Sequence, residues 1–289
     1  MTALFARAPG KVNLSLFVGA PRADGLHPLV SVVQAVTVAD ELTLAPAPDG
    51  ASGDEVVCPG VDGPNLAGRA LSAFRTATGW DAPPQRLEIV KRVPVAAGMG
   101  GGSADAAAAL RLAAHAAGGA PPALLHDLAV SLGADVPSLL TPGRVLMSGA
   151  GEHVDVLPEP APFGVVIVPS GLTLSTPAVY GAFDRIGGAR DAAELELRAD
   201  AARAGEPPPP VNDLQDAARS LCPPIDAALA DVRAAGAHTA MVAGSGPTVF
   251  GLFDDIAAAR AAAAVLSARH PQAVAAEPAS AAFAEVRAA

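Results

Sequence analysis

The sequence predicts an α+β fold divided into two domains, residues 1–155 and 156–289. Three observations predict it. The chain has 289 residues, of which 51% are apolar, which is enough for one large domain or two medium-sized ones with hydrophobic cores, and we expect two. Its first half contains strand-like segments and then two successive helix-like segments, rather than a regular alternation of strand and helix. An apolar segment bounded by prolines, at 161–171, marks the region where the second domain is expected to begin.

The first elements are expected to be a pair of strands. Residues 11–19 alternate apolar side chains with polar or smaller ones, and residues 30–44 are rich in β-branched residues. A helix is predicted over 65–79, because apolar residues recur at helical spacing and Gly79 suits the C-terminal end. Residues 86–95 alternate again, which predicts a further strand.

A glycine-rich loop follows that strand, in the stretch VAAGMGGGSADAAAAL at 95–110. The next helix is predicted to begin near Ser103, whose hydroxyl suits an N-cap, with Asp105 in its first turn, and to fade at 118–122. Consecutive glycines before a helix allow backbone N–H groups to converge at its positive end. The loop therefore predicts a phosphate-binding site, with a plain glycine turn as the alternative.

Two other phosphate-binding loops fit less well. A P-loop requires Lys after its glycines, and none follows in this stretch. A dinucleotide fingerprint nearly matches Gly98, Gly100 and Ser103, but it belongs to a βαβ unit. The next element of this chain is predicted to be a second helix, at 122–133, so a dinucleotide-binding fold is disfavoured.

The remaining elements are predicted from the same kinds of pattern. They are a hairpin at 143–149 and 151–157, a buried strand within 161–171, an exposed proline-rich connection at 204–210, a helix in 211–221, a strand-turn-strand unit at 239–253 and a helix at 254–270. No repeat of fixed period is present.

Charge and cysteine content exclude several classes of protein. The net charge of −10 and the near absence of basic clusters argue against nucleic-acid binding. Arg7 and Lys11 interrupt the apolar residues near the N-terminus, and no later window is apolar enough for a membrane helix. Cys58 and Cys222 are far apart in sequence, which gives no support for zinc or a disulfide. We expect a soluble, unprocessed, cytoplasmic protein.

The basic residues are nearly all arginine, and only Lys11 and Lys91 are lysines. Where arginine is the usual cation, a lysine is a candidate for a position that needs a compact ammonium group. For Lys91, chance survival of a surface lysine is an equal alternative.

Three stretches resemble the ordered motifs of the GHMP kinases. They are APGKVNLSLFV at 8–18, PVAAGMGGGSADAA at 94–107 and MVAGSGPTVFGLF at 241–253, which together span most of the chain. The resemblance implies a two-domain GHMP kinase fold, with a ribosomal protein S5 domain 2-like N-terminal domain and a ferredoxin-like C-terminal domain. The stretches DGLH at 24–27, GADVP at 133–137 and VNDLQ resemble the members that use ATP to phosphorylate a cytidine-diphosphate-linked alcohol in the non-mevalonate route to isoprenoid precursors.

The resemblance implies catalytic roles for two residues. Asp135 matches the general base that takes the proton of the acceptor hydroxyl, and Lys11 matches a cation beside both Asp135 and the acceptor oxygen. Asn13 lies two residues after Lys11, on the same strand face, and is expected to hydrogen-bond the acceptor side of the substrate. Without the resemblance, Asp135 could equally be a turn residue.

The resemblance also implies a pocket for a cytosine base. His27 matches the residue that hydrogen-bonds the base, and Tyr180 matches an aromatic residue on one face of it. Leu26 departs from the family, in which a tyrosine is expected to stack on the opposite face. An isolated histidine would more often be a solvated loop residue.

Nucleotide binding is expected at the second and third motifs. Ser103 is the hydroxyl expected near Mg²⁺, and Asn65 matches a position close to the adenine. The residues expected to line the triphosphate are Gly98, Gly100, Gly101, Gly102 and Ser103, and those of the third motif, which closes the site from the second domain, are Gly244, Ser245 and Gly246. By itself the third motif could be a simple hairpin turn.

The expected cofactors are ATP and Mg²⁺, and the expected partner is the small-molecule substrate, with no nucleic acid and no membrane. The protein is expected to be a monomer or homodimer. A homoserine, mevalonate or phosphomevalonate kinase, or a GHMP-fold protein that binds nucleotide without turnover, are the alternative functions.

Overall fold

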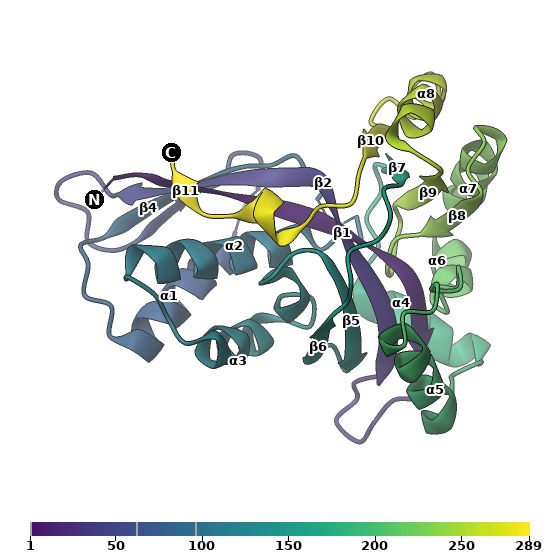
Figure 1. Ribbon diagram of the computed structural model, residues 1–289, viewed down its shortest axis with the longest axis horizontal. Helices are drawn as coiled ribbons and strands as arrows, with labels where there is room; N and C mark the ends of the chain where they lie inside the picture. The colour runs from purple at the N-terminus through teal and green to yellow at the C-terminus, as the bar shows by residue number, and fades with distance from the viewer. Residues whose placement is uncertain (1, 62, 96) are drawn as a thin grey trace.

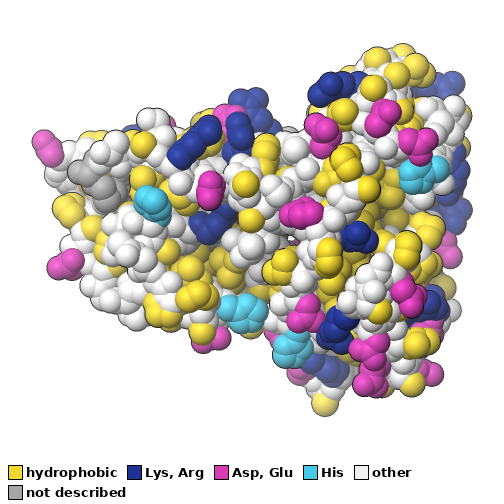
Figure 2. All heavy atoms as spheres, in the orientation of Figure 1, with side chains coloured by type: hydrophobic (Ala, Val, Ile, Leu, Met, Phe, Trp, Pro, Cys, Tyr) yellow, Lys and Arg dark blue, Asp and Glu magenta, His cyan; other side chains and the backbone are white. Residues whose placement is uncertain are grey.

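The computed structural model describes residues 2–61, 63–95 and 97–289. Two sheets organise the chain, and helices pack against each of them (Figure 1). No helix among the described residues is both long enough and apolar enough to cross a membrane. In the space-filling view the outline is indented at the top, between the first sheet and the helix near residue 260 (Figure 2).

The first sheet is built around two long strands that pair antiparallel, β1 (Leu4–Val18) and β2 (Leu29–Pro46). The sheet has the order β11-β1-β2-β4-β3, and β5 pairs with both β2 and β6. Its other strands are β3 (Glu55–Val57), β4 (Gln85–Val90), β5 (Arg144–Gly149), β6 (His153–Val156) and β11 (Arg287–Ala288).

One edge of β2 is shared by two partners. Residues 41–46 pair with β4 and residues 29–34 pair with β5. Near the gap between them, the Asp40 carboxylate accepts hydrogen bonds from the backbone N–H groups of Arg92 and Val93. This contact draws the chain away from the sheet, so β4 ends at Val90 and the strand predicted over 86–95 is too long.

Three helices cover one face of this sheet: α1 (Leu66–Thr78), α2 (Gly101–Ala116) and α3 (Pro122–Leu132). The short 3₁₀ helix η1 (Pro137–Leu139) follows α3. Helix α2 is central, and its buried alanines pack with Leu71, Phe74 and Leu110 in the core of this half. Small side chains on α2 allow α1 and β1 to approach it closely.

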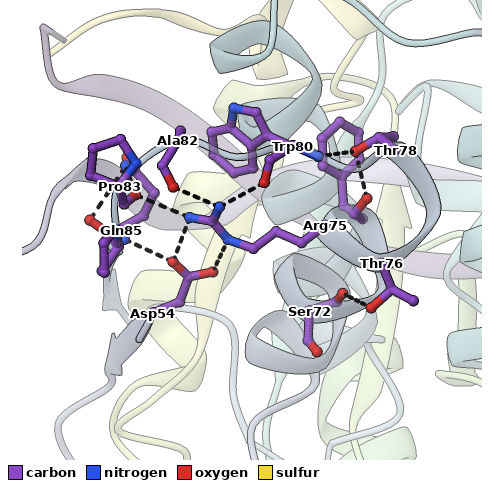
Figure 3. Close-up of polar contacts among 11 residues, drawn as sticks. Asp54, Ser72, Arg75, Thr76, Thr78, Trp80, Ala82, Pro83 and Gln85 are labelled. Atoms are coloured by element: carbon purple, nitrogen blue, oxygen red, sulfur yellow. Dashed lines mark hydrogen bonds and ion pairs between the residues drawn. The ribbon is translucent and has the colours of Figure 1, made fainter. Parts of the chain in front are cut away.

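Helix α1 has the ends that its sequence predicts. Asn65 is the N-cap and its Oδ1 accepts from the N–H of Ala67, while Gly79 closes the helix in the left-handed region at φ 65°. Arg75, in the last turn, forms a two-pronged ion pair with Asp54 and donates to the carbonyls of Trp80 and Ala82 (Figure 3). This network ties the end of α1 to the segments on either side.

The second sheet has the order β10-β7-β9-β8, with all pairs antiparallel. Its strands are β7 (Gly164–Val168), β8 (Thr239–Val242), β9 (Val249–Phe253) and β10 (Val274–Ala276). Helical chain joins β7 to β8 and β9 to β10, which is the βαββαβ pattern of a ferredoxin-like fold. The helices are α4 (Thr176–Ile186), α5 (Ala192–Arg203), α6 (Gln215–Leu221), α7 (Pro224–Ala234) and α8 (Ile256–Leu266).

The two sheets share a core. Val12 and Leu14 of β1 belong to the same buried cluster as Val165 and Ile167 of β7 and Phe250 of β9. The last residues return to the first sheet through the 3₁₀ helix η2 (Ala281–Ala284) and β11, which pairs with the start of β1. The division at residue 155 stays a prediction.

The α+β class and most of the predicted elements are confirmed, but the predicted start of α2 near Ser103 is wrong. The helix begins at Gly101, with Gly100 as its N-cap, so Ser103 is its third residue and Asp105 lies beyond the first turn. Three glycines in a row suggested a loop, but burial of the following alanines against the sheet outweighs the poor helix propensity of glycine. Helices α4, α5 and α7 were not predicted.

Candidate active site

A cleft of about 950 Å³ opens where the two halves meet, lined by β1, the glycine-rich loop, α4 and the turn between β8 and β9. The structure brings together in this one cleft every residue that the sequence predicts for catalysis or binding: Lys11, Asn13, Leu26, His27, Asn65, Gly98, Gly100, Gly101, Gly102, Ser103, Asp135, Tyr180, Gly244, Ser245 and Gly246. Their individual roles stay predictions.

The glycine-rich loop and the third motif touch through their backbones. Gly98 has φ 74°, and a Cβ placed on it would lie 2.2 Å from the carbonyl oxygen of Ala243 and 3.0 Å from the N of Gly246. Both the left-handed conformation and the close approach therefore require glycine there. The contact fixes the loop of the first half against the turn of the second.

Among the described residues, no side chain caps the N-terminus of α2, which faces the cleft. Gly100 has φ 68° and makes no side-chain cap, and Gly100, Gly101, Gly102 and Ser103 all line the cleft. An uncapped helix start presents free N–H groups and the positive end of the helix dipole. It is therefore suited to bind an anion such as a phosphate.

Asn212, in the stretch VNDLQ, fixes the turn of the third motif by hydrogen bonds to its backbone. The Asn212 amide donates to the carbonyls of Val242 and Gly244, at 2.9 and 2.8 Å. Gly244 has φ 53°, and a Cβ there would lie 3.1 Å from Lys11 Nζ. The turn thus lies directly over the Lys11 ammonium group.

Lys11 and Asp135 form the charged centre of the cleft. Lys11 is 4% exposed, and its Nζ lies 3.7 Å from Asp135 Oδ2 and donates to Asn13 Oδ1 at 3.0 Å. Asn13 in turn donates to Ser31 Oγ at 2.8 Å, so its amide is held in place. The register of β1 shifts between residues 9 and 11 and again between residues 13 and 15, so the two shifts flank Lys11 and Asn13. Such irregularities are expected where a bulge changes the direction of side chains.

Asp135 lies in the connection between α3 and η1. Its backbone carbonyl accepts from Ser138 Oγ at 2.8 Å, which fixes the local turn, and 37% of its side chain is exposed. The carboxylate therefore combines a fixed backbone with access from the cleft. This arrangement is suited to accept a proton from a bound hydroxyl.

His27, Tyr180 and Leu26 form one end of the cleft. The His27 ring is buried and packs on Tyr180, with ring centroids 4.9 Å apart, while Leu26 is 53% exposed. Burial, and next the Asp135 charge, raise the pKa of the Tyr180 phenol to about 12, so it stays neutral and acts as an uncharged aromatic surface. Asp184, one helical turn after Tyr180, lines the same end and was missed in the sequence.

The cleft lining also includes Asn65 and two members of a buried ionic cluster, Lys91 and Asp105. Lys91 Nζ bonds Asp40 Oδ2 and lies 2.7 Å from Asp105 Oδ2, so Lys91 is no surface lysine. Burial raises the pKa of Asp105 to about 7, against the opposing effect of Lys91, and the nearby Asp40 raises it further. The pKa of Lys91 is raised by the two carboxylates in spite of burial. The cluster ties β2 and the start of the loop to α2.

No group of three or more His, Cys, Asp or Glu side chains converges on one point among the described residues. A protein cage for a metal is therefore absent from that part of the chain. Mg²⁺ in kinases needs only one or two protein oxygens, because phosphates and water complete its shell. Ser103 in the first turn of α2 provides one such oxygen at the cleft.

Comparison with known proteins identifies relatives that match most of the chain. Residues 65–143 match the GHMP kinases N terminal domain, and residues 189–272 match the GHMP kinases C terminal family. The 4-diphosphocytidyl-2-C-methyl-D-erythritol kinase of Streptomyces coelicolor is 42% identical over 91% of this chain and 91% of its own. The enzyme of the same name from Methylorubrum extorquens is 42% identical over 94% of this chain and 97% of its own.

Solved structures of GHMP kinases have the same fold as this chain. A crystal structure of 4-(cytidine 5'-diphospho)-2C-methyl-D-erythritol kinase superposes with a TM-score of 0.78 at 34% identity, covering 94% of this chain and 98% of that one. Homoserine kinase from Cytophaga hutchinsonii shares the fold, with a TM-score of 0.65 at 18% identity over 99% of this chain and 97% of that one. Three motifs in one cleft, both domain matches and relatives that span more than nine tenths of the sequence agree: the chain belongs to the GHMP kinase family.

Proposed function

We propose that this protein is an ATP-dependent kinase that phosphorylates the 2-hydroxyl of 4-diphosphocytidyl-2-C-methyl-D-erythritol, a step of the non-mevalonate isoprenoid pathway. The observation that carries the proposal is a single cleft in which the Lys11–Asp135 pair lies together with a phosphate-binding loop and a pocket built by His27 and Tyr180. The names of the relatives at 42% identity supply the substrate.

Asp135 is the proposed general base. As the acceptor oxygen forms its bond to the γ-phosphorus of ATP, the bond from that phosphorus to the β,γ-bridging oxygen breaks and ADP leaves. The hydroxyl proton passes to the Asp135 carboxylate. A partly exposed carboxylate on a fixed turn is positioned to receive it.

Lys11 has two proposed tasks. Its Nζ lies 3.7 Å from Asp135 Oδ2, so the ammonium group is positioned beside both the base and the acceptor oxygen. Its buried ammonium also offsets negative charge that develops on the transferred phosphoryl group, since charge interactions strengthen where water is excluded. Asn13 holds the ammonium in place and stays within reach of the acceptor side of the substrate.

ATP is proposed to lie along the glycine-rich loop, with its phosphates at the start of α2. Asn65 uses its Oδ1 as the cap of α1, which leaves its amide N–H groups as the donors available to an adenine ring. The third motif covers the phosphates from the second half of the chain. Mg²⁺ bound to the phosphates, with Ser103 as a protein ligand, would neutralise part of their charge.

The cytosine base is proposed to occupy the end formed by Leu26, His27 and Tyr180. Tyr180 provides an aromatic face and Leu26 an aliphatic one. His27 provides a polar edge at the base of this pocket.

A coupled assay of ADP release with a panel of alcohols tests the proposal. The panel contains the cytidine-linked substrate, homoserine, mevalonate and phosphomevalonate, and we expect turnover with the first alone. Turnover with one of the other alcohols would assign another GHMP kinase activity. Binding of ATP without turnover of any acceptor would indicate a non-catalytic nucleotide-binding protein.

A further inference from the structure

One of the two ring nitrogens of His27 is already held by the backbone. Its Nδ1 lies 2.8 Å from the carbonyl oxygen of Gly19, and because a carbonyl only accepts, Nδ1 carries the proton of that bond. The ring is 9% exposed and also packs edge-on against Phe183. The His27 atom that remains for a polar contact with a base is therefore Nε2.

Asp184 lies next to that nitrogen. Its Oδ1 is 3.5 Å from His27 Nε2, and 43% of its side chain is exposed. Asp184 and Tyr180 are four residues apart on α4, so both side chains are on the same face of the helix, and both line the cleft. Within the described ranges, Asp184 forms no ion pair with Lys or Arg. Its carboxylate is thus available at the cleft surface.

A carboxylate at this position distinguishes pyrimidine bases. Cytosine presents an amino group at C4, which donates, whereas uracil presents an oxygen there, which accepts. An ionised carboxylate accepts only, so it pairs with the amino group of cytosine and repels the O4 of uracil. Carboxylates that accept from the cytosine amino group are a recurrent mode of base recognition.

We propose that Asp184 is a specificity-determining residue that accepts a hydrogen bond from the exocyclic amine of a cytosine base, beside His27 Nε2 and against the face of Tyr180. This inference rests on the proposed function and extends it, because it names the group that rejects a uridine-linked substrate. The alternative is that Asp184 only steadies His27 and makes no contact with the base.

The test is isothermal titration with cytidine diphosphate and uridine diphosphate, on the parent protein, Asp184→Ala and Asp184→Asn. The readout is the ratio of the two dissociation constants. Loss of a negative charge alters the attraction for the diphosphate equally in both ligands, so it cancels from the ratio. Asp200→Asn, on the surface of α5, removes the same charge away from the cleft and is the matched control.

We expect the parent protein and Asp200→Asn to prefer cytidine diphosphate, and Asp184→Ala to lower the preference by about tenfold or more, as for loss of one specific base contact. Asp184→Asn should lose preference mainly by tighter uridine binding, because the amide can turn its NH₂ toward O4. ATP affinity should stay unchanged in all variants, which shows that the cleft is intact.

Two results would overturn the role of Asp184 alone. In one, the parent protein prefers cytidine and both Asp184 variants keep that ratio. In the other, both ligands weaken in parallel, which would assign Asp184 to pocket structure only. A parent protein that does not distinguish the two ligands would instead refute the proposed substrate, together with this inference.

Discussion

The ammonium group of Lys11 lies 3.7 Å from the carboxylate of Asp135, although the two residues come from a strand near the N-terminus and from a turn after α3. The lysine is buried and the carboxylate is open to the cleft. An accessible carboxylate on a fixed turn is positioned to accept a proton from a hydroxyl bound in the cleft.

Replacing Asp135 by Asn should therefore abolish proton acceptance while leaving the shape of the site unchanged. We expect kcat to fall by at least about 10²-fold, as is typical when a general base is lost. The dissociation constant for ATP should stay nearly unchanged, because the phosphates bind at the start of α2. Steady-state kinetics and titration with ATP measure the two effects, and a near-normal kcat would reject Asp135 as the base.

Gly98→Ala should disrupt the contact between the second and third motifs. An added Cβ would meet the Ala243 carbonyl oxygen at 2.2 Å, and the φ of 74° is unfavourable for alanine. We expect a lower melting temperature and a large rise in the KM for ATP. Gly102→Ala is the control for stability, because no atom of the described residues lies within 4 Å of its added Cβ and alanine favours the helix. Equal melting temperatures for the two variants would contradict a steric requirement for glycine at position 98.

The Lys91 cluster should contribute strongly to stability. Lys91→Met leaves Asp40 and Asp105 buried without their cation, and breaking a buried pair in this way costs about 3–5 kcal/mol. The neighbouring Arg92, which is 58% exposed and pairs with Glu41, provides the control. Arg92→Met should cost about 0–1 kcal/mol. Urea unfolding measures both, and a Lys91→Met variant as stable as Arg92→Met would contradict the proposed importance of the cluster.

Asp105 should also make stability depend on pH. Burial raises its pKa to about 7 in the folded protein, from an ordinary value of 3.8. Between those values the folded state keeps a proton that the unfolded chain has released, so the Asp105 contribution is full below about pH 4 and is lost as the pH rises through 7. We expect Asp105→Asn to gain stability relative to the parent protein from about pH 5 to about pH 8. If the unfolding free energies of Asp105→Asn and the parent protein differ by a constant amount across this pH range, Asp105 is not the source of the pH dependence.

The sequence was informative where function depends on local backbone conformation. Gly98 and Gly100 both have positive φ and the helix follows at once, so the sharp turn that the glycines indicated is present, while phosphate binding there stays a prediction. Gly79 is likewise a local signal, and it closes α1 as predicted, whereas the N-cap role of Asn65 was not predicted.

The sequence was less informative where a residue depends on distant partners. Lys91 bonds carboxylates that are 51 and 14 residues away in sequence, so only the folded chain shows that it is buried rather than on the surface. Asp184 was missed because α4 was not recognised. That helix is short and contains Gly181, and the four-residue spacing from Tyr180 has meaning only once the helix is known.

Leu26→Tyr should strengthen binding of the cytidine-linked substrate. Leu26 is 53% exposed at the same end of the cleft as Tyr180 and His27, so a larger ring has room there. A second aromatic face is worth about 1–3 kcal/mol where a base stacks on it, and the smaller value corresponds to roughly fivefold tighter binding.

Leu197, which is 63% exposed on α5 and away from the cleft, gives the matched control Leu197→Tyr. Titration with cytidine diphosphate should show tighter binding for Leu26→Tyr alone, with ATP affinity unchanged, and Tyr180→Ala should weaken the same ligand. If Leu26→Tyr and Tyr180→Ala both leave the affinity unaltered, the base does not bind at this end of the cleft.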